Sequence, residues 1–241
     1  ATHLAAMTRL PDRPAPSTAV AAFLDKVGQL GAVKPAPGRC GRLLFAVDAT
    51  ASRQPTWDVA CDLQAEMFQA TRDLGGIAVS LVYYRGFGEC RATPFLTDTA
   101  ELARRMAMVE CLGGRTQIGR VLDHALAVTK QDPVQAMVFV GDAIEEEVDP
   151  LCHLAGELGM RSTPVFVFHE GHDAVAGTAF RQIAKLSGGA YAPFDRASAG
   201  ALRDLLRAVA VFAAGGRRAL AALTGPAARG IPSRRRPSRS P

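Results

Sequence analysis

Two short runs in the sequence are apolar at every position, and each leads into an aspartate. LLFAV, residues 43–47, is followed by Asp48, and AMVFV, residues 136–140, is followed after one glycine by Asp142. A strand without polar positions is buried on both faces, which is typical of a parallel sheet covered by helices on both sides. Such sheets bind ligands at the carboxyl ends of their strands, where both aspartates are expected to lie.

Strand and helix patterns alternate along the rest of the chain. After one helix between residues 17 and 30, the patterns predict strands 42–48, 77–84, 136–141, 163–168 and 190–194, and helices 56–74, 98–110, 118–130, 148–158, 174–187 and 198–214. This order predicts an α/β fold with a doubly wound, mostly parallel six-stranded sheet, helices on both faces and at most one short antiparallel edge. Gly215 and Gly216 are expected to interrupt the last helix.

The composition is that of a globular chain with one sizeable core. Of 241 residues, 48% are hydrophobic and 21% are charged, and no apolar run approaches the roughly 20 residues that a membrane span needs. The five cysteines are scattered without a close pair, which argues against a disulfide framework and against a zinc site. Because the first residues also lack a signal-peptide pattern, we expect a cytoplasmic protein.

The chain is expected to have three parts. Residues 1–39 form an N-terminal extension with one helix and a Pro-rich linker, residues 40–224 form the α/β domain with a C-terminal helix, and residues 225–241 form a basic tail. A short Arg/Pro/Ser segment cannot bury enough apolar surface to fold, so the tail is expected to be disordered. The arginines of the tail could bind nucleic acid or an anionic surface. The favoured interpretation is that the tail is only solvated.

Side chains with oxygen atoms gather at the expected ligand edge. Asp48, Thr50 and Ser52 leave the first strand, Asp142 follows a later strand, and Thr116 comes after two glycines and just before a helix. Carboxylates and hydroxyls without a histidine or cysteine suit a hard cation such as Mg²⁺ better than zinc. Since Mg²⁺ keeps several waters, such a site leaves a coordination position for the oxygen of a ligand.

These motifs resemble the metal-ion-dependent adhesion site of von Willebrand factor type A domains. The pattern of that family is Asp-x-Ser-x-Ser, then a distant Thr and a distant Asp, and this sequence has DATAS, the threonine of GGRT and the aspartate of FVGD. The similarity spans residues 40 to about 213, and Thr50 stands where the family usually has serine. The resemblance implies a type A fold.

The resemblance also implies a function and a role for each motif residue. Thr50, Ser52 and Thr116 would coordinate Mg²⁺, with Mn²⁺ or Ca²⁺ as alternatives, and Asp48 and Asp142 would hold the ion largely through bound waters. The module would not be an enzyme. It would be a bacterial, intracellular domain that captures an Asp or Glu side chain of a partner protein, as a component of a larger complex.

A phosphohydrolase of the HAD type is the alternative. Those enzymes also begin with a buried strand that ends in a nucleophilic aspartate, here Asp48, with a hydroxyl four residues later, here Ser52. Lys130 lies between the two acidic motifs, where those enzymes have a lysine. Thr50, however, stands where the soluble phosphatases have the aspartate that acts as general acid and base.

Two further polar segments are expected in loops. HEGHD follows the predicted strand 163–168. Its His169, Glu170 and His172 are part of a partner-binding rim, part of a second metal site or, as favoured, an ordinary polar loop. The acidic run 145–147 is expected near the N-terminus of the helix that follows it, because acids there match the helix dipole.

Overall fold

The structure is a computed structural model that describes residues 18–31, 35–194 and 199–224. The predicted basic tail, residues 225–241, lies outside the described residues.

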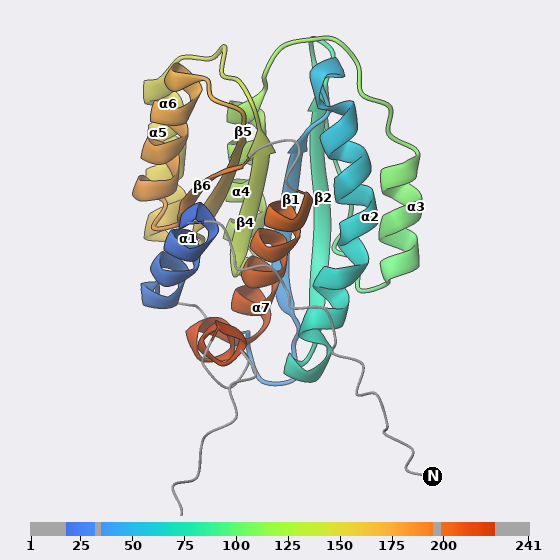
Figure 1. The fold of residues 1–241 in the computed structure, drawn as a ribbon, viewed down its shortest axis with the longest axis vertical. Coiled ribbons are helices and arrows are strands. Elements are labelled where there is room, and N and C mark those ends of the chain that lie inside the picture. Colours follow the sequence, from blue (N-terminus) through green and yellow to red (C-terminus); the bar gives the residue numbers. More distant parts are fainter. Residues whose placement is uncertain (1–17, 32–34, 195–198, 225–241) are drawn as a thin grey trace, which may run out of the picture.

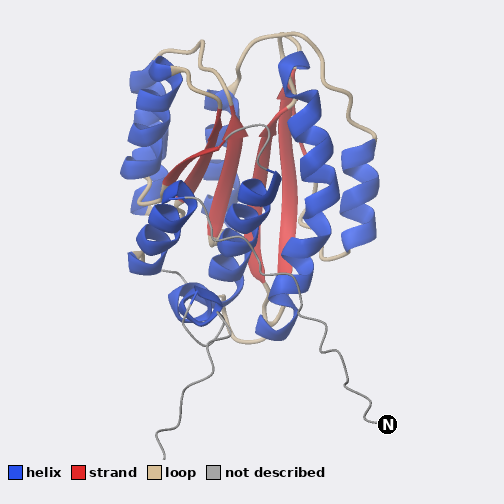
Figure 2. Ribbon diagram, viewed as in Figure 1, coloured by secondary structure: helices blue, strands red, loops and turns tan. Residues whose placement is uncertain are grey.

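A six-stranded sheet forms the centre of the molecule, with the strand order β3-β2-β1-β4-β5-β6 (Figures 1 and 2). The strands are β1 (Gly41–Asp48), β2 (Ile77–Arg85), β3 (Glu89–Ala92), β4 (Ala136–Gly141), β5 (Val165–Glu170) and β6 (Tyr191–Phe194). All neighbouring strands are parallel except β3, which runs antiparallel to β2 at one edge. The prediction of a mostly parallel six-stranded sheet, with at most one short antiparallel edge, is therefore confirmed.

Helices cover both faces of the sheet. They are α1 (Thr18–Gln29), α2 (Gln54–Thr71), α3 (Thr99–Ala107), α4 (Ile118–Gln131), α5 (Val148–Met160), α6 (Ala174–Leu186) and α7 (Ala199–Thr224). Helices α1, α2, α3 and α7 pack on one face, and α4, α5 and α6 pack on the other (Figure 2). None of the described helices is long and apolar enough to cross a membrane.

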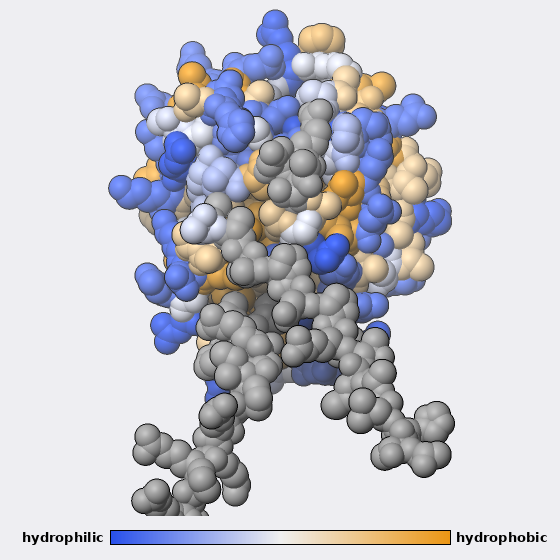
Figure 3. Space-filling model, viewed as in Figure 1, coloured by the Kyte–Doolittle hydropathy of each residue, from blue (hydrophilic) through white to orange (hydrophobic). Residues whose placement is uncertain are grey.

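The buried side chains form one cluster on each face of the sheet. On the first face, α1 inserts Phe23 against Phe166 and Phe168 of β5, with edge-to-face ring centroids 5.8 and 5.5 Å apart. The helix of the expected N-terminal extension thus shares the core of the α/β domain. Figure 3 shows polar residues over much of the described surface on this face, as expected for helices whose apolar side faces a sheet.

Most element boundaries agree with the sequence prediction to within about three residues, and three differences are informative. β3 was not predicted, because its four residues are only partly buried and contain no apolar run. β5 includes His169 and Glu170, which the sequence placed in a loop, because β6 pairs with both of them. α7 reaches Thr224, and the expected interruption is confirmed at Gly216, which has φ 69° and ψ −166°.

The strand order reverses between β1 and β4. From β1 the chain crosses over through α2 to β2, whereas from β4 it crosses through α5 on the opposite face to β5. The two connections therefore leave the sheet in opposite directions and open a crevice at the carboxyl ends of β1 and β4. Asp48 ends β1 and Asp142 follows β4, so this topology places both aspartates at that crevice.

Candidate metal centre

All five predicted metal ligands line one cleft at this crevice. Its volume is about 290 Å³. The lining residues are Asp48, Thr50, Ala51, Ser52, Gly113, Gly114, Thr116, Asp142, Ala143 and Glu145. They come from three loops: the loop between β1 and α2, the loop before α4, and the loop between β4 and α5. The fold thus brings two carboxylates and three hydroxyls together from separate parts of the chain.

The DATAS segment turns sharply as it leaves β1. The Thr50 N–H donates a hydrogen bond to Asp48 Oδ1 at 2.7 Å, which is the side-chain turn that aspartate commonly makes two residues ahead. Ser52 then follows in a short 3₁₀ turn (Ala51–Arg53), and its Oγ donates to Asp142 Oδ2 at 3.2 Å. This turn brings the Ser52 hydroxyl to the aspartate of the neighbouring strand.

Asp48 carries a buried oxygen with no hydrogen-bond partner. Its side chain is 1% exposed, and among the described residues no group meets Oδ2 in hydrogen-bond geometry. Burial raises the pKa of Asp48, against the opposing effects of Thr50 and of the nearby Tyr84 hydroxyl, although that hydroxyl does not meet Oδ2 in full hydrogen-bond geometry. Its neighbour in register on β2 is the buried Tyr84, whose pKa is raised by burial and by the charge of Asp48. A buried carboxylate oxygen without a well-formed hydrogen bond is costly to stability and is typical of a functional site.

Thr116 is held by a reciprocal pair of hydrogen bonds. Its N–H donates to Glu145 Oε2 at 3.0 Å, and the Glu145 N–H donates to Thr116 Oγ1 at 3.0 Å. Glu146 accepts from the N–H groups of Ile118 at 2.6 Å and Gly119 at 2.9 Å. We call these contacts of Glu145 and Glu146 the acid clasp. As expected from the sequence, the acidic run lies at a helix N-terminus, since Glu147 directly precedes α5. The side chains of Glu145 and Glu146, however, bind the start of α4.

The two glycines before Thr116 have different roles. A Cβ atom on Gly114 would lie 2.0 Å from the carbonyl oxygen of Gly86, in the turn between β2 and β3. The next residue, Arg115, donates its N–H to the same oxygen at 3.1 Å. Gly113, in contrast, has nothing within 4 Å of its Cβ position. Gly114 therefore allows a close backbone contact that fixes the loop carrying Thr116.

We expect Gly114→Ala to destabilise the protein by about 1–3 kcal/mol, because the new methyl group cannot fit against the Gly86 backbone. Gly113→Ala is the matched control and should change the free energy of unfolding by less than about 0.5 kcal/mol. Urea unfolding of both variants measures the difference. Equal stabilities would show that the contact between the two loops does not constrain the structure.

Arg53 belongs to the same region, although the sequence prediction did not include it. Its side chain is 1% exposed, and its Nη1 lies 3.1 Å from Asp142 Oδ2. Its Nη2 forms an ion pair with Glu170 and donates to Thr56 Oγ1 at 2.8 Å. The only signal in the sequence is an arginine directly after the DATAS motif. Nothing in the sequence identifies its partners.

The structure corrects the expected positions of two rim residues. His169 and Glu170 lie in β5 and are buried, whereas His172 is exposed in the loop that follows. His169 Nδ1 is 2.8 Å from the hydroxyl of Tyr191 on β6, and burial lowers the pKa of His169. In this conformation only His172 of the three offers its side chain to a partner.

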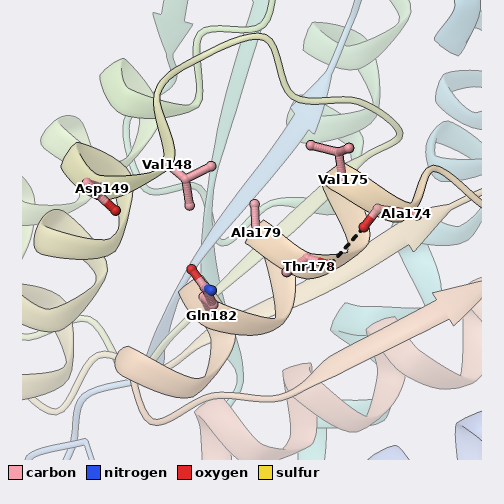
Figure 4. A pocket seen from close by; sticks show the side chains of 7 residues that line it. All are labelled: Val148, Asp149, Ala174, Val175, Thr178, Ala179 and Gln182. Carbon is pink, nitrogen blue, oxygen red and sulfur yellow. Dashed lines mark hydrogen bonds between the residues drawn. The ribbon is translucent and has the colours of Figure 1, made fainter.

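A second hollow, of about 480 Å³, lies between the first turns of α5 and α6 (Figure 4). It is lined by Val148, Asp149, Ala174, Val175, Thr178, Ala179 and Gln182. The Thr178 hydroxyl donates to the Ala174 carbonyl oxygen at 2.8 Å, as the dashed line shows (Figure 4). Asp149 is the one ionisable group of this lining, so the hollow offers no set of metal ligands comparable to the cleft.

Comparison with known proteins identifies the fold. No protein-family model matches the sequence, and no curated protein matches it. Among solved structures, the SpRpn10 VWA domain is 14% identical, with a TM-score of 0.53 over 70% of this chain and 94% of that one. A von Willebrand factor type A protein from Catenulispora acidiphila is 17% identical, with a TM-score of 0.59 over 71% of this chain and 43% of that one.

A third match is proximal thread matrix protein 1 from the mussel byssus, solved with a zinc-occupied MIDAS motif. It is 16% identical, with a TM-score of 0.56 over 71% of this chain and 46% of that one. This chain thus covers less than half the length of the Catenulispora and mussel proteins. The fold that the motif residues predicted is confirmed by these matches: the chain has the fold of von Willebrand factor type A domains.

Proposed function

We propose that this protein is a Mg²⁺-dependent protein-binding module whose cleft captures an acidic side chain of a partner. The residues that would hold the ion are Asp48, Thr50, Ser52, Thr116 and Asp142. The observation that carries the proposal is the meeting of these two carboxylates and three hydroxyls in one cleft, beside a buried Asp48 oxygen that lacks a donor. Bound there, the ion would supply an electrophilic position for a carboxylate oxygen.

The donor set fits a hard divalent cation. Mg²⁺ prefers oxygen ligands and keeps several waters, and a water or the ion itself would satisfy Asp48 Oδ2. Thr116 Oγ1 accepts one hydrogen bond from the Glu145 N–H, which leaves it a second lone pair. Within the described part of the chain, no three His, Cys, Asp or Glu side chains are grouped to hold a metal, so the hydroxyls are needed. Mn²⁺ or Ca²⁺ could take the same ligands.

The similar structures support the type of function. The mussel protein has a zinc-occupied MIDAS motif by its description, so a protein of this fold can hold a divalent ion. We extend this to the present chain as a module that works in the bacterial cytoplasm as a component of a larger complex. The proposed binding domain is residues 40–224, on which α1 of the N-terminal extension packs.

The phosphohydrolase alternative gains no support from the geometry. Lys130 would have to reach the phosphate beside Asp48, but it is exposed near the C-terminal end of α4. At 1.5 Å per helical residue, it lies about 18 Å along the axis from Ile118, which begins that helix beside the cleft. The general acid and base of those enzymes also has no counterpart at Thr50.

Titration with Mn²⁺, followed by electron paramagnetic resonance and competed with Mg²⁺, tests the proposed function. We expect Thr116→Ala and Asp142→Ala to weaken Mn²⁺ binding at least tenfold, because each removes an oxygen from the cleft. Thr178→Ala, at an exposed threonine of α6, is the matched control and should bind as the wild type does.

Two results would contradict the proposal. The first is a folded wild-type protein that binds neither Mn²⁺ nor Mg²⁺. The second is metal-dependent turnover of p-nitrophenyl phosphate that is lost in Asp48→Asn, which would favour the phosphohydrolase.

A further inference from the structure

We propose that Arg53 is a resident counter-charge of the metal site, which holds Asp142 in place and limits the affinity of the cleft for a divalent cation. This inference rests on the proposed function, because it assigns a role to Arg53 at the same cation site. It makes Arg53 a positioning residue that sets how tightly the ion is held before a partner binds.

The first support is the burial of a full charge beside the cleft. Arg53 is 1% exposed, although arginine is among the residues least often buried without a partner. An arginine guanidinium is in general a permanent positive charge. It meets two carboxylates from different strands: Glu170 at the end of β5, which is buried, and Asp142 after β4, whose side chain is 24% exposed. The chain therefore keeps a fixed positive charge directly beside one of the proposed metal-binding residues.

The second support is which oxygen of Asp142 is engaged. Oδ2 lies 3.1 Å from Arg53 Nη1 and accepts from Ser52 Oγ at 3.2 Å. One hydrogen-bond donor, Ser52 Oγ, and one cationic group, the Arg53 guanidinium, thus meet the same carboxylate oxygen and restrict its orientation. The guanidinium, which also pairs with Glu170, balances part of the negative charge that Asp142 would offer to a cation.

The third support is the low-dielectric environment of the ion pair. Charges near a buried group interact several times more strongly than charges in bulk water. Repulsion between Arg53 and a divalent ion in the cleft is therefore only weakly screened. Arg115, which is exposed and lies next to Thr116, is screened by solvent and salt. An acidic side chain from a partner would supply the negative charge that Arg53 has balanced.

Glu170 determines how this can be tested. Removal of Arg53 alone would leave Glu170 buried without its guanidinium partner, which commonly costs several kcal/mol. The double variant Arg53→Met/Glu170→Gln removes both charges together and leaves the sum of formal charges unchanged. Glu170→Gln alone removes one of the two carboxylates that Arg53 contacts and keeps Asp142. The guanidinium should therefore bind Asp142 more strongly. The two variants should therefore change cation affinity in opposite directions.

The experiment is a Mn²⁺ titration of the folded full chain, monitored by electron paramagnetic resonance at fixed ionic strength. We expect the double variant to bind Mn²⁺ about tenfold more tightly than the wild type, and Glu170→Gln to bind about fivefold more weakly. Arg53→Lys, which keeps the charge, should stay within about threefold of the wild type. Arg115→Met is the control for loss of an exposed charge and should stay within about twofold.

If Arg53 had a purely structural role, the double variant would be less stable than the wild type and would not bind Mn²⁺ more tightly. Equal or weaker Mn²⁺ binding by a cooperatively melting double variant would overturn the inference while the proposed function stands. If the double variant does not fold, unchanged binding by Glu170→Gln overturns it instead. Binding by the double variant but not by the wild type would support Arg53 as counter-charge and refute the proposed function of the native site. If none of the folded proteins binds Mn²⁺, both the proposed function and the inference about Arg53 are refuted.

Discussion

Replacement of Asp48 by asparagine is expected to weaken Mn²⁺ binding at least a hundredfold and, in the absence of metal, to raise the melting temperature at neutral pH by a few degrees. The loss follows because Asp48 is one of only two carboxylates among the five proposed ligands. The gain follows because the substituted side chain would no longer place a charge in a buried position, while its amide oxygen could still accept from the Thr50 N–H. Function and stability should therefore change in opposite directions, as is common at binding sites.

The stability gain should depend on pH with a defined sign. Burial raises the pKa of Asp48, so the folded protein favours the protonated carboxyl. Below the ordinary range of aspartate pKa values, the carboxyl is protonated in both the folded and unfolded states, and Asp48 imposes no penalty. As the pH rises from the ordinary aspartate pKa to the raised pKa of the folded state, the wild type loses stability relative to Asp48→Asn, and above the raised pKa the difference stays constant. Thermal melts without metal between about pH 3 and pH 8 measure this difference.

Two comparisons complete the Asp48 test. Asp73→Asn, at an exposed acid beyond α2, should leave both Mn²⁺ binding and the pH profile unchanged. Added Mn²⁺ should stabilise the wild type but not Asp48→Asn, since only a protein that binds the ion gains from it. An Asp48→Asn protein that is less stable than the wild type at every pH would show that the carboxylate stabilises the fold.

The second large effect is on the core. We expect Phe23→Ala to destabilise the protein by about 3–5 kcal/mol, because it removes a buried ring that packs edge-to-face on Phe166 and Phe168. This is a large share of the roughly 5–15 kcal/mol by which a domain is usually stable. Urea unfolding monitored by circular dichroism measures the change.

The control for Phe23→Ala lies on the same helix. Lys26→Ala removes an exposed side chain from α1 and should change the free energy of unfolding by less than about 0.5 kcal/mol. If Phe23→Ala were equally mild, α1 would not contribute to the core in solution. The N-terminal extension could then be removed without loss of stability.

The central strands could be predicted because their burial is visible in the sequence. The runs that form β1 and β4 are apolar at every position, and both strands are buried along almost their whole length. β3 gave no such signal, since its stability comes from backbone pairing with β2 and not from an apolar face. His169 and Glu170 were placed in a loop because they are polar, yet their pairing with β6 extends β5 through both residues.

The proposed ligands could likewise be identified from the sequence, because the resemblance depends on residue types in a fixed order. Their surroundings could not. Arg53 meets Asp142 and Glu170 only after three separate strands have been placed side by side. The acid clasp depends on a loop folding over a helix that precedes it in the chain. Such contacts are set by tertiary structure, and no local spacing indicates them.

The acid clasp also determines which anions the cleft can accept. The start of a helix often binds a carboxylate or phosphate through its unpaired N–H groups and the positive end of its dipole. At the start of α4, however, Glu145 and Glu146 already accept from the N–H groups of Thr116, Ile118 and Gly119. The helix N-terminus next to the cleft is thus an anion site that the protein's own carboxylates already occupy. An incoming acidic group would find these donors taken, and it would depend on the cation for its attachment.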